Sequence, residues 1–144
     1  MNVPLLVLPV ATLVLLSFVF SGSETALFSL SKSELYSFSI SKRKSENILA
    51  RLMKRPQAIL VTILTGNLLV NNLLTMLVTD SLVSRFHDYG HLVSIGIVTP
   101  LLIVVCEMLP KLLSVRQPHL VSRSVAGFIR WVHILLIPLT FVLH

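Results

Sequence analysis

The chain has 144 residues and a net charge of +6, with 54% hydrophobic residues and only 12% charged ones. A soluble domain carries about 25% charged residues, so this chain has too little polar surface to cover itself in water. The composition excludes a disordered chain, a collagen and a soluble nucleic-acid-binding protein, and it indicates a single membrane domain. The single cysteine, Cys106, excludes a disulfide framework and a multi-cysteine metal site.

The first predicted element is an apolar run over residues 3–23, which is followed by Glu24. A membrane-spanning helix needs about 20 mainly apolar residues, so this run can cross a bilayer. A signal peptide is the alternative, but it would begin with a basic segment, and no Lys or Arg precedes Lys32. Ser21 and Ser23 close the run with small polar side chains, which suit either close helix packing or a site of oxygen donors.

A basic segment over residues 31–55 follows and is expected to hold two short helices beneath the membrane. Ser31 with Glu34 predicts a capping box at the start of the first helix. Ser41 or Ser45 predicts a second capping box at the start of the next helix.

The second apolar run covers residues 56–79 and contains no charged residue. Asn67 and Asn71 lie four residues apart within it and therefore share one face of a helix. Two amides on an apolar helix can hydrogen-bond to a neighbouring helix, or they can offer carbonyl oxygens to a cation. The sequence leaves both interpretations open.

The third run reaches the length of a span, residues 92–115, only if Glu107 and Pro110 are accepted within the bilayer. Pro110 has no backbone N–H, so the carbonyl of Cys106 loses its usual helical donor. Lys111 lies four residues after Glu107 and could pair with it as a structural ion pair. The alternative is a cation site in which Lys111 or a bound cation balances the carboxylate.

The last stretch, residues 118–144, is predicted to lie along the membrane surface. Its uninterrupted apolar part after Arg130 is only 13 or so residues, which is short for a span. Val125, Ile129 and their neighbours follow helical spacing, and Trp131 suits the headgroup level. A fourth span is the alternative.

Basic residues flank the apolar runs, and this distribution predicts the orientation. The segment 32–55 and the segment after the third run are basic and should be cytoplasmic, whereas the connection over residues 80–91 holds one Arg and two Asp and should face outside. The prediction is three crossings with the N-terminus outside and the C-terminus in the cytoplasm.

The polar groups within the apolar runs are hydroxyls, amide carbonyls and a carboxylate. These hard oxygen donors suit Mg²⁺, Ca²⁺ or Na⁺ and do not suit a soft metal. Pro100 would kink the third helix. Broken helices often lie near transport sites, but proline is also frequent in membrane helices generally. The sequence offers no Ser-His-Asp set at one depth and no phosphate-binding loop, so an enzyme is not expected.

Three stretches together resemble the membrane domain of the CorC / cyclin M (CNNM) family of magnesium transporters, whose bacterial members are often labelled haemolysin-like. They are FSGSETALFSLSKSEL (20–35), RPQAILVTILTGNLLVNN (55–72) and EMLPK (107–111). The resemblance implies an all-α membrane protein with three transmembrane helices, a cytoplasmic helical pair between the first two, and an interfacial belt helix at the C-terminus. It also implies a homodimer in the bilayer. Residues 1–144 would then be the single transmembrane domain, without the ATP-binding CBS module and C-terminal domain that follow it in the family.

The resemblance further implies that the chain binds Mg²⁺ within the membrane and exports it across the bacterial inner membrane, with exchange for Na⁺ as the proposed coupling. The family's ion ligands match Ser21, Asn67 and Glu107, and the neighbouring positions match Ser23, Asn71 and Lys111. The alternative function is a non-transporting membrane sensor or scaffold that regulates cation homeostasis.

Overall fold

The computed structural model describes residues 3–86 and 89–142, and within these residues it contains helices and no strand. Three helices are long and apolar enough to cross a membrane: Leu6–Phe28, Pro56–Phe86 and Gly90–Arg116. The three predicted spans are thereby confirmed, and the fold is that of an all-α membrane protein. The second span is longer than its apolar run, because the helix continues through most of the predicted connection over residues 80–91; His87 and Asp88 of that connection lie outside the described residues.

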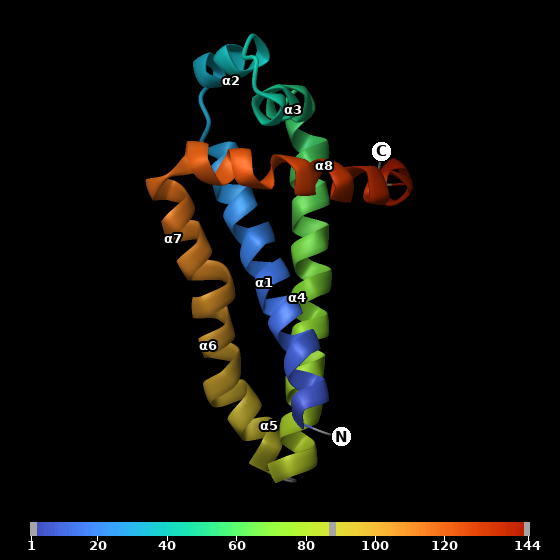
Figure 1. The fold of residues 1–144 in the computed structure, drawn as a ribbon. Helices are drawn as coiled ribbons and strands as arrows, with labels where there is room; N and C mark the ends of the chain where they lie inside the picture. The colour runs from blue at the N-terminus through green and yellow to red at the C-terminus, as the bar shows by residue number, and fades with distance from the viewer. Residues whose placement is uncertain (1–2, 87–88, 143–144) are drawn as a thin grey trace.

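The first span is α1 (Val3–Phe28) and the second is α4 (Pro56–Phe86), and the two pack against each other. The third span is built from five consecutive pieces that form one continuous rod (Figure 1): α5 (Gly90–Val93), η2 (Ser94–Val98), α6 (Thr99–Ile103), η3 (Val104–Met108) and α7 (Leu109–Arg116). Its first half contacts α4, and its second half contacts α1. The contact with α1 is close, because a Cβ added at Gly22 would lie 3.1 Å from Ser114 Oγ.

The pieces η2 and η3 are π-helical turns, and each stands directly before a proline-containing turn. The N–H of Thr99 donates to the carbonyl of Ser94, and the N–H of Leu109 donates to the carbonyl of Val104, five residues back in both cases. Proline cannot donate to the carbonyl four residues before it, and its ring clashes there. The third span thus accommodates Pro100 and Pro110 by widening the helix by one residue.

A helical hairpin joins the first two spans, as expected: α2 (Lys32–Ser39) and α3 (Lys44–Leu52). The capping box of α2 is confirmed, since the N–H of Glu34 donates to Ser31 Oγ and the N–H of Ser31 donates to Glu34 Oε2 at 2.6 Å. The predicted second capping box is wrong, because α3 begins after Arg43, whose side chain makes no capping hydrogen bond. Ser41 instead accepts the N–H of Arg43 on its hydroxyl oxygen and so shapes the turn before α3.

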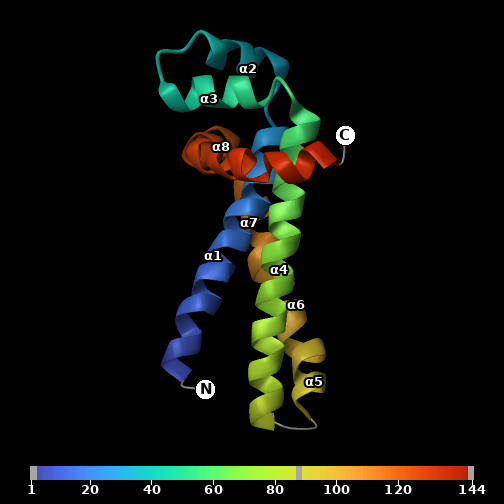
Figure 2. The same cartoon turned by 90° about the vertical axis from the view of Figure 1, so that its right-hand side faces the viewer.

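The last helix, α8 (Pro118–Val142), lies across α1 and α4 at the end of the bundle that carries the hairpin (Figures 1 and 2). Val125, Ala126, Ile129 and Val132 form its buried face, and Trp131 is exposed. This crosswise placement favours the predicted interfacial helix over a fourth span.

Basic residues collect at this same end. Of the twelve Lys and Arg residues, only Arg85 lies elsewhere, near the end of α4; the others are on α2, α3, their flanking turns, α7 and α8. The core beneath them is formed by side chains of α1, α3, α4 and α8, such as Leu27, Leu49, Ile63 and Ile129.

Candidate cation site

The polar residues of the three spans meet in one chain of hydrogen bonds that links α1, α4 and the third span. Ser17 on α1 is fully buried, and its hydroxyl donates to Asn71 Oδ1 at 2.5 Å. Asn71 Nδ2 in turn donates to Glu107 Oε1 at 2.9 Å. Each of the three spans therefore contributes one member of the chain.

Asn67 and Ser21 flank this chain. Asn67 Oδ1 lies 3.4 Å from the Ser17 hydroxyl and 3.5 Å from Asn71 Nδ2, so the two asparagines do share one face of α4. The Ser21 hydroxyl donates to the backbone carbonyl of Glu107 at 3.2 Å. The structure thus brings together four of the six residues that the sequence singled out: Ser21, Asn67, Asn71 and Glu107.

The other two residues lie apart from this cluster. The hydroxyl of Ser23 bonds back to the carbonyl of Val19, one turn earlier on its own helix. Lys111 Nζ lies 3.3 Å from Glu24 Oε2, so the ion pair with Glu107, one of the two alternatives that the sequence left open, is not the pair that Lys111 makes. Glu107 lies within the π-helical turn η3, where residues four apart no longer keep the register of a regular α-helix.

A small cavity adjoins the carboxylate of Glu107. Its volume is about 90 Å³, which is room for several water molecules. Besides Glu107 and Asn71, two threonines line it, Thr75 from α4 and Thr99 from α6, and the Thr99 hydroxyl donates to the carbonyl of Ser94. Cys106 also lines it and is buried. The cavity is therefore lined by oxygen-bearing side chains from two spans, and one of them is a carboxylate.

Sequence reasoning missed Ser17, Thr75 and Thr99. Ser17 lies one turn before Ser21 and so falls on the same face of α1, just as Asn67 and Asn71 pair on α4. A search for polar residues four apart within the apolar runs would have found it. The two threonines carry no such signal, because hydroxyl side chains are common in membrane helices.

The cluster suits a hard cation that keeps part of its water. Within residues 3–86 and 89–142, no group of three His, Cys, Asp or Glu side chains lies close enough to hold a metal ion. The available donors are one carboxylate, two amides, hydroxyls and a backbone carbonyl. Mg²⁺ is usually held by one or two carboxylates and retains several waters, whereas a soft metal would need thiolate or imidazole.

Without an ion, the polar side chains of the cluster hydrogen-bond to one another, and the amide of Asn71 joins Ser17 to Glu107. Its N–H group faces the Glu107 carboxylate and its oxygen faces Ser17. If this amide turned over, its oxygen would face the carboxylate and its N–H group would face Ser17 Oγ, which can accept it while the Ser17 O–H points to Asn67 Oδ1. Two facing acceptors repel each other unless a proton or a cation lies between them. The same residues can therefore serve an empty and a loaded site.

Comparisons with known proteins agree with this architecture. Residues 8–144 match the family model described as the cyclin M transmembrane N-terminal domain. The chain is 29% identical over 129 residues to the UPF0053 inner membrane protein YfjD of Escherichia coli, which covers 90% of this chain and 30% of that protein. It is 33% identical over 107 residues to a UPF0053 protein of Haemophilus influenzae, covering 74% of this chain and 26% of that protein.

A chloroplastic DUF21 domain-containing protein of Arabidopsis thaliana is 29% identical, over 89% of this chain and 19% of its own length. The chain thus spans less than a third of the length of these relatives. The family match extends over all three spans, the hairpin and α8, which include every residue of the cluster. The chain belongs to the cyclin M transmembrane N-terminal domain family.

Proposed function

We propose that this chain is the ion-translocating membrane domain of a Mg²⁺ transporter. The observation that carries the proposal is the carboxylate of Glu107, which lies within a membrane span, beside a cavity and in contact with an amide of a second span. An ionised group at such a depth costs at least ~2.5–3.5 kcal/mol and marks an ion pathway by default. Membership of the cyclin M family supports Mg²⁺ as the cargo.

In the proposed mechanism, partly hydrated Mg²⁺ enters the cavity and Glu107 supplies the neutralising charge. The amide of Asn71 turns its oxygen toward the ion, and Ser17 Oγ accepts the released N–H group. Ser21 holds the backbone carbonyl of Glu107 and so orients its turn. The π-helical turns before Pro100 and Pro110 are the places where the third span can change its winding as the site opens to one side or the other.

The wider setting belongs to the same proposal. The concentration of Lys and Arg at the hairpin end supports a cytoplasmic location for that end, an outside N-terminus and a cytoplasmic C-terminus. The inner-membrane name of the Escherichia coli relative supports the same membrane for this chain. The proposal includes export of Mg²⁺ in exchange for Na⁺. It also includes a homodimer, whose partner covers part of the exposed apolar third span, and regulation by an ATP-binding module elsewhere in the full protein.

The test is Mg²⁺ flux in liposomes with an internal Mg²⁺-sensitive dye, with and without a Na⁺ gradient. Glu107→Gln keeps the size of the side chain but removes its charge, and we expect flux to fall at least tenfold, since the ion loses its only carboxylate ligand. Asp80→Asn, at an exposed position at the far end of α4, is the matched control and should retain parental flux.

A second candidate, a non-transporting sensor or scaffold, is favoured by the closed hydrogen bonding of the cluster, since a packing network needs no ion. Flux in Glu107→Gln equal to that of Asp80→Asn would contradict transport through this site. Mg²⁺ binding that is lost in folded Glu107→Gln, with no flux in the parent protein, would support the sensor.

A further inference from the structure

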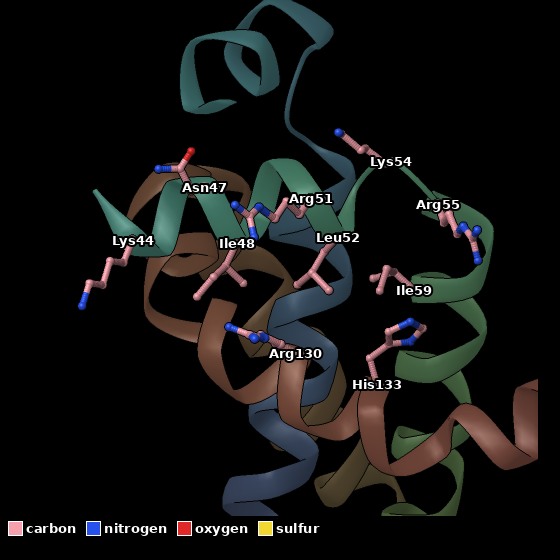
Figure 3. Close-up of a pocket in the computed structure, with 10 residues that line it drawn as sticks. All are labelled: Lys44, Asn47, Ile48, Arg51, Leu52, Lys54, Arg55, Ile59, Arg130 and His133. Atoms are coloured by element: carbon pink, nitrogen blue, oxygen red, sulfur yellow. The ribbon is translucent and has the colours of Figure 1, made fainter. Parts of the chain in front are cut away.

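A larger cavity lies at the hairpin end of the bundle, between α3, the start of α4 and α8 (Figure 3). Its volume is about 580 Å³, and it is partly enclosed. Half of its ten lining residues are cations: Lys44, Arg51, Lys54, Arg55 and Arg130. None of the ten is Asp or Glu. The cavity shares no residue with the cation site described above.

The positive charge of this cavity is not balanced within the described part of the chain. The glutamates at this end have other partners: Glu46 pairs with Arg123 and Arg43, Glu34 with His119, and Glu24 with Lys111. Among the described residues, none of the five cavity cations makes an ion pair. Like charges gathered in a partly enclosed space repel one another, and the arrangement is stabilised when an anion enters.

The positive charge of this cavity also affects the pKa of His133 on α8. Burial lowers the pKa of its imidazole, and the neighbouring charge of Arg55 lowers the pKa further. The imidazole is therefore neutral near pH 7. Its Nδ1 lies 2.9 Å from Thr62 Oγ1. The protein thus avoids adding another positive charge to this cavity.

The rest of the wall is apolar and indicates an amphiphilic ligand. Ile48, Leu52 and Ile59 lie between the cations (Figure 3). The cavity also borders α8, the helix predicted to lie at the membrane surface, on which Trp131 follows Arg130 directly and is exposed. A small soluble anion would gain nothing from the apolar side chains, whereas a lipid would cover them with its glycerol and upper acyl carbons.

We propose that this cavity binds the phosphate headgroup of an anionic phospholipid. Arg51 of α3 and Arg130 of α8 project on either side of Ile48 (Figure 3), and their guanidinium groups suit bidentate contacts with phosphate oxygens. Lys44, Lys54 and Arg55 add charge around the rim. One lipid would then connect the hairpin to α8 and hold both at the membrane surface. The proposal does not rest on the transport function.

The test is native mass spectrometry of the 144-residue chain in detergent with added phosphatidylglycerol. We expect one phosphatidylglycerol to be retained per chain, and about tenfold weaker retention in Arg51→Gln/Arg130→Gln, which removes two cations near the phosphate. The matched control is Lys42→Gln/Arg116→Gln, which removes the same charge from exposed positions outside the cavity and should retain lipid as the parent does. Lys44→Gln/Lys54→Gln keeps both arginines and should weaken retention less than the arginine pair does.

Two further arms identify the source of the phosphate. Phosphatidylcholine should be retained less than phosphatidylglycerol, since its choline balances the phosphate charge, and millimolar glycerol 3-phosphate should not displace the lipid. Binding of glycerol 3-phosphate as tight as that of phosphatidylglycerol would overturn a lipid site in favour of a soluble phosphate site. Equal lipid retention in the arginine pair and in the control pair would overturn a specific site altogether.

Discussion

At the scale of single residues, Gly66 determines how closely α1 can approach α4. A Cβ added at this position would lie 2.5 Å from Cζ of Phe20, and that ring is itself buried edge-on against Phe128, with 5.2 Å between the ring centroids. The ring therefore has little room to move. Since Asn67 follows Gly66 directly, the same close approach allows the asparagines of α4 to reach Ser17 on α1.

We expect Gly66→Ala to lower the free energy of unfolding by about 0.5–2 kcal/mol. Overpacking costs about 1–3 kcal/mol, and the better helix propensity of alanine offsets up to about 1 kcal/mol of that loss. Thermal unfolding in detergent, followed by circular dichroism, measures the change. The control is Gly127→Ala on α8, where nothing lies within 4 Å of an added Cβ, so only the gain in propensity remains. Phe20→Leu should restore part of the loss in Gly66→Ala, and a Gly66→Ala protein as stable as Gly127→Ala would contradict this account.

At the scale of elements, one ion pair ties α8 to the hairpin. Glu46 of α3 is 5% exposed, and its Oε1 lies 2.6 Å from Arg123 Nη2 of α8. The guanidinium of Arg123 also lies 5.7 Å above the ring of Phe38 on α2, within the range of a cation–π contact. Arg123 therefore joins three helices that are separate in sequence.

We expect Glu46→Ala to destabilise the protein by about 1–2 kcal/mol. Removing one partner of a fully buried pair costs about 3–5 kcal/mol, but the side chain of Arg123 is 37% exposed, and water screens the charge that is left. Urea unfolding in detergent measures the loss. Because the two side chains are coupled, Glu46→Ala/Arg123→Ala should lose less stability than the sum of the two single variants. Strict additivity would mean that the pair contributes nothing.

At the scale of the whole molecule, hydropathy and the placement of charge predict the spans and the crosswise last helix, because both are set by transfer between water and lipid. The site is less predictable, because it depends on the rotation of each helix about its own axis. Spacing on a regular helix would pair Glu107 with Lys111, but the π-helical turn that Pro110 requires directs these side chains to Asn71 and Glu24 instead. Asn67 and Asn71 were predictable because no such turn interrupts α4 between them.

The pH dependence of stability follows from how α8 packs on α4. Burial and the charge of Arg55 lower the pKa of His133 below its ordinary 6.5 in the folded protein, whereas the unfolded chain protonates near 6.5. As the pH falls through 6.5, the unfolded state binds a proton on His133 and the folded state does not. The contribution of His133 to stability is therefore complete above pH 6.5 and declines below it until the folded pKa is reached. Hydrogen bonds with Ser31 lower the pKa of Glu34 below its ordinary 4.5. The contribution of Glu34 to stability is therefore complete above pH 4.5, and it does not affect the comparison at higher pH.

The unfolding temperature in phospholipid-free detergent should therefore drop more between pH 7.5 and pH 5.5 for the parent than for His133→Gln, which cannot titrate but can still meet Thr62. An equal drop in both proteins would assign the acid sensitivity to another group. If phosphatidylglycerol occupies the cavity beside His133, its phosphate offsets the field of Arg55 and favours the imidazolium. Added lipid should then reduce the acid-induced drop in the parent and leave His133→Gln unchanged.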